Sequence, residues 1–167
     1  PSPGDMNPDH PHLRPVPPAT AAGEALAVDR SAPGWNGITP PRARPGGPRF
    51  LTDVIVELGL APRERVEAAI ESARASGGTP EDILVQAGAL SQDALARAIA
   101  ERNGLDHLDL AVMQVDMAAA NLISSAAAKR YEAVPVQFIG HRGLLVAMAD
   151  PTNVLAVDDI ALMTGYE

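Results

Sequence analysis

The sequence predicts an α+β protein in which a tandem helical repeat precedes a small helix–β-hairpin–helix unit, with a proline-rich arm in front of both. Three observations lead to this prediction. Proline density falls sharply after residue 48, apolar residues recur at helical spacing with an offset of 29 residues, and strand-like alternation is confined to the last third. We therefore divide the chain into an arm over 1–48, a repeat over 49–104 and an α+β unit over 105–167.

The arm is predicted to be disordered. It holds 12 of the 16 prolines, and its four basic and four acidic side chains cancel. A neutral segment rich in Pro, Gly and Ala buries too little apolar surface to offset the entropy lost on ordering. Three features of the arm could nevertheless have a binding function. His10 and His12 could bind a metal, residues 15–18 could be a polyproline ligand of a partner, and Trp35 could be a docking anchor. A plain disordered arm is the favoured interpretation.

The repeat begins at Leu51, from which apolar residues follow helical spacing as far as Leu58, and Gly59 then ends the first helix. A second helix starts at Pro62 and ends at Gly77. A shift of 29 residues reproduces this pattern, and the equivalent pairs are Val54 with Ile83, Ile55 with Leu84, Val56 with Val85, Gly59 with Gly88, Val66 with Leu95, Ala69 with Ala98 and Ile70 with Ile99. Because neither helix pair can bury its apolar stripe alone, we predict one stacked four-helix core.

The α+β unit is predicted from a change of periodicity. Residues 117–130 are Ala-rich and helical in pattern, residues 134–138 and 144–149 form a hairpin around a turn at 140–143, and a last helix follows Asn153. This last helix is predicted to face inward with four residues, Val154, Val157, Ile160 and Ala161, and outward with Asp158 and Asp159. His107 is predicted to be an exposed loop residue.

Composition excludes several classes of function. The chain has no cysteine, which rules out disulfide scaffolds, iron–sulfur clusters and thiol catalysis. All of the net charge of -8 lies in residues 49–167, where 17 acidic side chains face nine basic ones, and this argues against binding to nucleic acid or to an anionic membrane. No apolar run reaches the roughly 18 residues of a membrane span. We also expect no catalytic and no metal-binding residues.

Two strings of residues carry a family resemblance. Residues 144–153 read Leu-Leu-Val-Ala-Met-Ala-Asp-Pro-Thr-Asn, and residues 158–160, Asp-Asp-Ile, precede Met-Thr-Gly at 163–165. Together with the repeat, they resemble the N-terminal domain, of MshEN or GspE-N type, of type II secretion and type IV pilus assembly ATPases (the GspE/PilB family). The resemblance spans residues 50–167 and leaves the arm outside.

The resemblance implies a non-catalytic docking and regulatory module that couples a motor to the cytoplasmic domain of an inner-membrane platform protein. The chain has no Gly-x-x-x-x-Gly-Lys-Ser/Thr loop and a single lysine, Lys129, so ATP and Mg²⁺ would bind elsewhere in the parent ATPase. Since the chain begins with Pro1, we expect a piece of a longer protein, monomeric by itself and hexameric in its parent. It would be cytoplasmic and held at the membrane by partners, without inserting into it. We expect the partner to contact acidic residues, namely Glu57, Glu64, Glu67 and Glu71.

Some members of the family bind cyclic di-GMP on this module, which makes a sensor an alternative function. The family motif implies ten candidate residues here, namely Arg49, Phe50, Leu51, Ile55, Val56, Gly59, Leu84, Val85, Gly88 and Arg102. The polar positions depart from the motif. Phe50 and Thr52 replace its Arg and Gly, Pro80 and Glu81 replace Leu-Gly, and its Gln residues become Ala73 and Arg102. These departures favour the interpretation that the repeat has a structural role and binds no nucleotide. A regulatory module on an unrelated enzyme, such as a membrane glycosyltransferase, is a third alternative.

Overall fold

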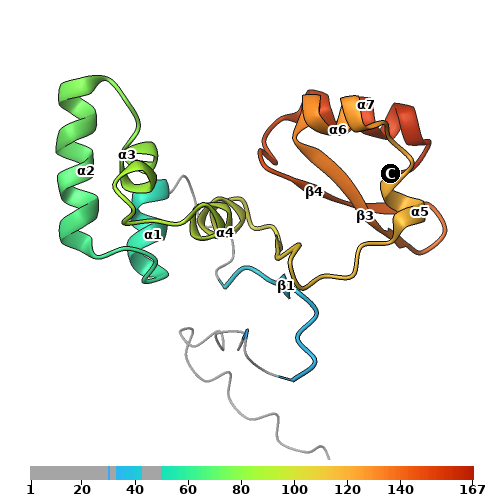
Figure 1. The fold of residues 1–167 in the computed structure, drawn as a ribbon, viewed down its shortest axis with the longest axis horizontal. Coiled ribbons are helices and arrows are strands. Elements are labelled where there is room, and N and C mark those ends of the chain that lie inside the picture. Colours follow the sequence, from blue (N-terminus) through green and yellow to red (C-terminus); the bar gives the residue numbers. More distant parts are fainter. Residues whose placement is uncertain (1–29, 31–32, 43–49) are drawn as a thin grey trace, which may run out of the picture.

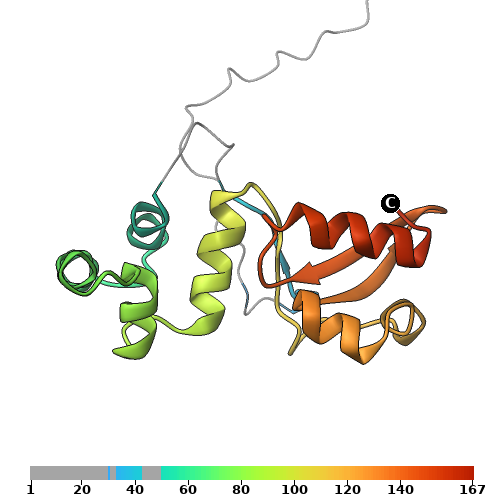
Figure 2. The same cartoon turned by 90° about the horizontal axis from the view of Figure 1, so that it is seen from above.

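The computed structural model describes residue 30 and residues 33–42 and 50–167 of the chain. Within these ranges it has seven helices and two separate antiparallel strand pairs, which confirms the α+β class. Figures 1 and 2 show two units lying side by side, joined through the chain that leaves helix α4 (Gln92–Arg102). The first unit is helical and the second contains the hairpin, in the predicted order.

The first unit consists of α1 (Leu51–Glu57), α2 (Arg63–Ser76), α3 (Pro80–Gln86) and α4. The hydroxyls of Thr79 and Ser91 cap α3 and α4 by accepting from the backbone N–H groups of Asp82 and Ala94. Gly77 ends α2 in the left-handed conformation, where a residue without a Cβ has no steric cost.

Helices of the two copies pack crosswise, because α1 lies against α4 and α2 lies against α3. Each short helix thus covers the long helix of the other copy, which explains why one copy cannot bury its stripe alone. The buried core draws on both copies and consists of Leu51, Val54, Ile55, Ala61, Val66, Ala69, Leu84, Leu90 and Ala98. The predicted four-helix core is confirmed.

The second unit follows a short strand, β2 (His107–Leu108), and contains α5 (Met117–Ala120), α6 (Ser125–Tyr131), β3 (Ala133–Ile139), β4 (Gly143–Met148) and α7 (Val154–Thr164). Strands β3 and β4 form the predicted hairpin, with a register shift between Pro135 and Gln137. A proline cannot donate to a strand ladder, so a bulge beside Pro135 is the expected irregularity.

The structure refines one prediction for the second unit and corrects another. The helical stretch expected over 117–130 is divided into α5 and α6, because the Ser124 hydroxyl accepts from the Ala127 N–H and starts a new helix, as expected for an N-cap at Ser124. In α7 the buried residues are Ala156 and Ile160, whereas Val154 and Val157 are 65% and 45% exposed. Helix α7 is apolar on almost every side, so spacing alone does not determine which stripe faces the hairpin.

Part of the arm is ordered, which corrects the prediction of disorder for residues 33–42. Strand β1 (Ile38–Thr39) pairs antiparallel with β2, with Ile38 opposite Leu108 and Thr39 opposite His107. The candidate metal ligands His10 and His12 and the proline motif over 15–18 lie outside the described residues.

Two negative findings concern the described residues alone. None of the helices placed there combines the length and apolar character needed to cross a membrane. Nor does that part of the chain bring three or more His, Asp or Glu side chains into an arrangement that could hold a metal ion.

Candidate functional site

The two glycine turns that follow the short helices are geometrically equivalent. Gly59 and Gly88 have φ of 67° and 72°. Their N–H groups donate to Val56 and Val85 carbonyls, each at 3.0 Å. A Cβ at either glycine would meet no atom within 4 Å, so each glycine is required by the left-handed backbone and not by a crowded neighbour. Both turns are exposed and could accept a ligand from solvent.

The apolar candidates for nucleotide binding divide into two groups. Leu51, Ile55 and Leu84 are 9%, 0% and 2% exposed and belong to the helical core. Val56 and Val85 are half-buried at the surface of that core. Of these five aliphatic candidates, only Val56 and Val85 can present apolar surface to a ligand beside the glycine turns.

The remaining candidates are Arg49, Phe50 and Arg102. Arg49 lies outside the described residues, Phe50 is 76% exposed as the N-cap of α1, and Arg102 is exposed in the last turn of α4. The first turn of α3 carries Glu81 and Asp82, which add negative charge where a phosphate would need positive charge. The structure therefore brings the five aliphatic candidates together in the helical unit, while Arg102 is the cationic candidate that lies within the described residues.

The acidic residues predicted to contact a partner are exposed. Glu57 lies in α1, and Glu64, Glu67 and Glu71 lie in α2. Glu71 accepts a hydrogen bond from Arg74 at 3.1 Å. Three arginines, at 63, 65 and 74, share α2 with its three glutamates, so the helix presents charges of both signs instead of a uniformly acidic face.

A cluster that sequence reasoning missed surrounds His107. This residue is 4% exposed, so the prediction of an exposed loop histidine was wrong. Its Nε2 lies 3.2 Å from Asp93 Oδ1, and Arg30 contacts the other oxygen of Asp93 at 3.3 Å and Asp109 at 3.1 Å. Neither His107 Nδ1 nor the hydroxyl of Thr39 has a hydrogen-bond partner among the described residues, although both are buried. Burial results from the pairing of β1 with β2, which no pattern around His107 indicated.

Acidification is expected to destabilise this cluster. Burial lowers the pKa of His107 below 6.5, and Arg30 and Arg97 act in the same direction, against the opposing effects of Asp93 and Asp109. Because the unfolded state then binds more protons, the stabilisation is complete above pH 6.5 and is lost as the pH falls through the lowered pKa. Urea unfolding between about pH 7 and about pH 5 should therefore show decreasing stability. The variant His107→Gln should remove this decrease, and an unchanged profile in the variant would contradict the assignment.

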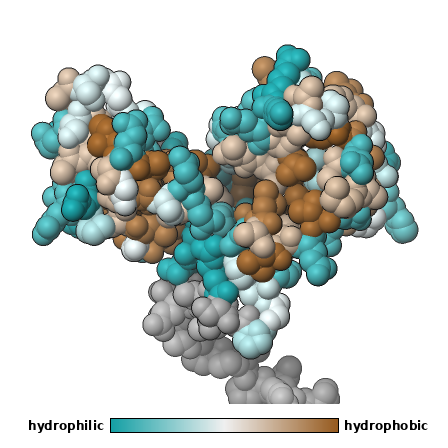
Figure 3. Space-filling model, in the orientation of Figure 1, coloured by the Kyte–Doolittle hydropathy of each residue, from teal (hydrophilic) through white to brown (hydrophobic). Residues whose placement is uncertain are grey.

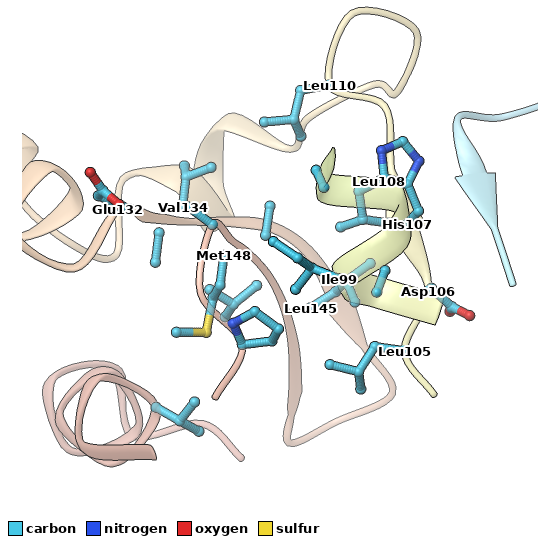
Figure 4. A pocket seen from close by; sticks show the side chains of 18 of the residues that line it. Ile99, Leu105, Asp106, His107, Leu108, Leu110, Glu132, Val134, Leu145 and Met148 are labelled. Atoms are coloured by element: carbon cyan, nitrogen blue, oxygen red, sulfur yellow. The ribbon is translucent and has the colours of Figure 1, made fainter. Parts of the chain in front are cut away.

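An apolar groove with a volume of about 790 Å³ lies between the two units. Figure 3 shows a notch between them with hydrophobic side chains on the wall of the second unit. Figure 4 shows Ile99 of α4, Leu105 and Leu108 of the connecting chain, and Leu145 and Met148 of β4 around this space. None of the nine nucleotide-binding candidates that lie within the described residues lines the groove. The groove and the glycine turns are therefore separate places on the molecule.

Comparison with known proteins finds similarity to one family model and to type IV pilus assembly ATPases. The model of the MshEN domain matches residues 103–167. The chain is 41% identical over 89 residues to the type IV pilus assembly ATPase PilB of Thermus thermophilus, and 29% identical over 116 residues to PilB of Myxococcus xanthus. A solved structure of MshE with cdg (cyclic di-GMP) aligns with a TM-score of 0.54 and 28% identity, covering 70% of this chain and 83% of that chain.

Residues 103–167 are similar to the MshEN domain. The predicted relationship to the N-terminal domain of type IV pilus and secretion ATPases is confirmed by these matches. The family match begins at the end of α4 and covers the whole second unit, while the arm and most of the helical repeat precede it. The alignments to the two PilB proteins cover 53% and 70% of this chain but 10% and 20% of those relatives, so the chain spans a fifth or less of their length.

Proposed function

We propose that this MshEN domain is a non-catalytic docking and regulatory module of a type IV pilus or type II secretion assembly ATPase. The observation that carries the proposal is the similarity to PilB proteins over 10% and 20% of their length, which makes the MshEN region one part of a much larger protein. In this proposal ATP and Mg²⁺ bind to the motor of a hexameric parent. The module is cytoplasmic and is held at the inner membrane by the cytoplasmic domain of a platform protein.

The exposed glutamates of α2 are the proposed contact with the platform protein. Glu64 and Glu67 are three residues apart, and Glu71 is four residues further along, so all three lie near one another on the helix surface. Arg63 and Arg65 occupy the same first turns of α2, where they offer a matched set of cationic side chains for comparison. A basic surface on the platform protein would attract the glutamates and repel the arginines.

The docking proposal is tested by binding of the 167-residue chain to the cytoplasmic domain of the platform protein, measured by surface plasmon resonance. The variant with Gln at 64, 67 and 71 is expected to bind about tenfold more weakly, since removing charges from an interface rim lowers affinity by on the order of 1 kcal/mol. The control with Gln at 63 and 65 should bind equally or more tightly. Equal weakening in both variants, or no binding of the unaltered chain, would contradict the proposal.

Cyclic di-GMP sensing is the second candidate function. It is favoured by the likeness to the structure of MshE with cdg and by the equivalent geometry of the turns at Gly59 and Gly88. The half-buried Val56 and Val85 beside these turns could contact the guanine bases. The acidic start of α3 opposes a dianionic ligand, since Glu81 and Asp82 lie in its first turn.

Isothermal titration calorimetry tests this second function. If the second copy holds the ligand, the double variant Pro80→Leu, Glu81→Gly should bind cyclic di-GMP about tenfold more tightly than the unaltered chain, because it removes a repelling carboxylate and restores the Leu-Gly start. Glu81→Gln is the matched control and isolates the contribution of charge. An absence of heat with all three proteins would exclude the sensor function for this chain.

A further inference from the structure

We propose that Arg30 and residues 33–42, here called the strap, are a brace that sets the angle between the two units. The strap acts on residues 103–116, here called the connection, which link α4 to the second unit. The strap binds both α4 and the connection, so it limits how far one can turn relative to the other. Figure 1 shows β1 running beside the connection below α4.

The strap contacts α4 at both ends of the helix. Near the start of α4, the Arg30 guanidinium lies 3.3 Å from the carboxylate of Asp93. Near its end, the Arg42 N–H donates to the two carboxylate oxygens of Glu101 at 2.9 and 2.8 Å. Two separated attachments on one rigid helix fix the direction of the strap as well as its position.

The strap also contacts the connection. Besides the β1–β2 pairing, the Asp109 N–H donates to the Gly37 carbonyl at 2.8 Å, and the Asp109 carboxylate accepts from Arg30 at 3.1 Å. The strap is itself held in shape by Trp35, whose Nε1 donates to the Ile38 carbonyl at 3.0 Å and whose ring lies 5.1 Å from the Arg30 guanidinium. Arg30 therefore joins α4, the connection and the strap in a single cluster.

A brace is needed here because the connection has little rigidity of its own. Within residues 103–116 the regular structure is limited to β2. The groove of about 790 Å³ separates α4 from β4, where direct packing of the units would otherwise fix their angle. The end of the connection is hydrogen-bonded to the second unit at Asp116, whose N–H donates to the Val136 carbonyl at 2.8 Å. The strap supplies support over the stretch between α4 and this point.

Two glycines of the strap offer a matched test. A Cβ at Gly37 would lie 2.9 Å from the Asp109 carbonyl oxygen and 3.0 Å from the Met113 nitrogen, so Gly37→Ala should push the strap off the connection. A Cβ at Gly34 would meet nothing within 4 Å. Gly34 and Gly37 have similar φ values of 90° and 86°, so Gly34→Ala carries the same backbone strain without the clash.

The test measures the distance between the units by pulsed electron–electron spin resonance on the full 167-residue chain. Because the chain has no cysteine, labels can be placed uniquely by Ser72→Cys in α2 and Asp158→Cys in α7, both exposed. We expect one narrow distance distribution in the labelled reference and in Gly34→Ala, and a broadened or shifted one in Gly37→Ala. Exchange of the Asp109 amide hydrogen should be about tenfold faster in Gly37→Ala than in Gly34→Ala.

Arg30→Ala is the second variant, and it removes the ion pairs without inserting atoms. It should broaden or shift the distance distribution as Gly37→Ala does, and circular dichroism should show unchanged helix content. If Gly37→Ala loses helix content, the conclusion is taken from Arg30→Ala alone. A distribution identical to that of Gly34→Ala, together with faster exchange at Asp109, would show that the strap binds the connection without setting the angle, and would overturn the proposal.

Discussion

Replacing Leu84 by alanine is expected to lower the free energy of unfolding of the first unit by about 2–5 kcal/mol. Leu84 is 2% exposed and lies in the core where α1, α2, α3 and α4 meet. The loss combines the transfer free energy of the removed methyl groups with the cost of a cavity that four packed helices cannot close. Ile55, its equivalent in the first copy, is 0% exposed, and Ile55→Ala should cost a similar amount.

Chemical denaturation followed by circular dichroism measures this effect. Gln86→Ala is the control, because Gln86 is exposed in the same helix and its truncation should change stability by less than about 0.5 kcal/mol. A result for Leu84→Ala within the range of the control would show that α3 is not part of the core. A large effect of Leu84→Ala with none for Ile55→Ala would contradict the equivalence of the two copies.

Replacing Ile160 by alanine is expected to destabilise the second unit by about 2–5 kcal/mol, because Ile160 is 3% exposed on the inner side of α7. Leu162 lies on the same helix and is 83% exposed, so Leu162→Ala should cost less than about 0.5 kcal/mol. Both changes shorten a branched aliphatic side chain, and the difference between them therefore reports burial.

Hydrogen exchange resolved by residue is the suitable measurement for Ile160→Ala. Exchange should accelerate in β3, β4 and α7 and remain unchanged in α1, α2 and α3, since few contacts connect the two units. Equal effects of Ile160→Ala and Leu162→Ala would mean that α7 packs with another stripe. That outcome would also contradict the sequence-based prediction, which places Ile160 inward together with Val154 and Val157.

The helical repeat shows what the spacing of apolar residues can predict about helices and their buried residues. The spacing from Leu51 to Leu58 and its recurrence 29 residues later predicted four helices and most of their buried residues. Capping chemistry predicted where α4 begins, because the Ser91 hydroxyl accepts from the Ala94 N–H. These predictions succeeded because helix spacing and capping involve residues within a few positions of one another.

Predictions of burial failed where the residues that pack against a side chain are distant from it in the sequence. Helix α7 is apolar on nearly all sides, and its contact with the hairpin determines that Ala156 and Ile160 are the buried residues. His107 is buried where it pairs with Thr39, a residue 68 positions earlier, across β1 and β2, and where its Nε2 meets Asp93 of α4. Nothing in the residues around His107 could reveal that partner.

For the candidate sites, too, the local pattern could be predicted from the sequence and the long-range packing could not. The motif positions implied by the family resemblance could be identified from the sequence, including their equivalence at Gly59 and Gly88. Which of these positions a ligand can reach could not be predicted from the sequence. Ile55 and Leu84 are core residues, while Val56 and Val85 are half-buried beside the turns. Exposure depends on crosswise packing of α1 with α4 and α2 with α3, which the linear pattern does not specify.

The sequence by itself determined the class of the protein, its repeat, its hairpin and its resemblance to the N-terminal domain of pilus and secretion ATPases, because these depend on local spacing and short motifs. The tertiary structure alone decided that residues 33–42 are ordered, that His107 is buried beside Asp93, and that an apolar groove separates the units. The physical reason is that Arg30 gains its partners, Asp93 and Asp109, only after α4 and the connection have been brought together by folding.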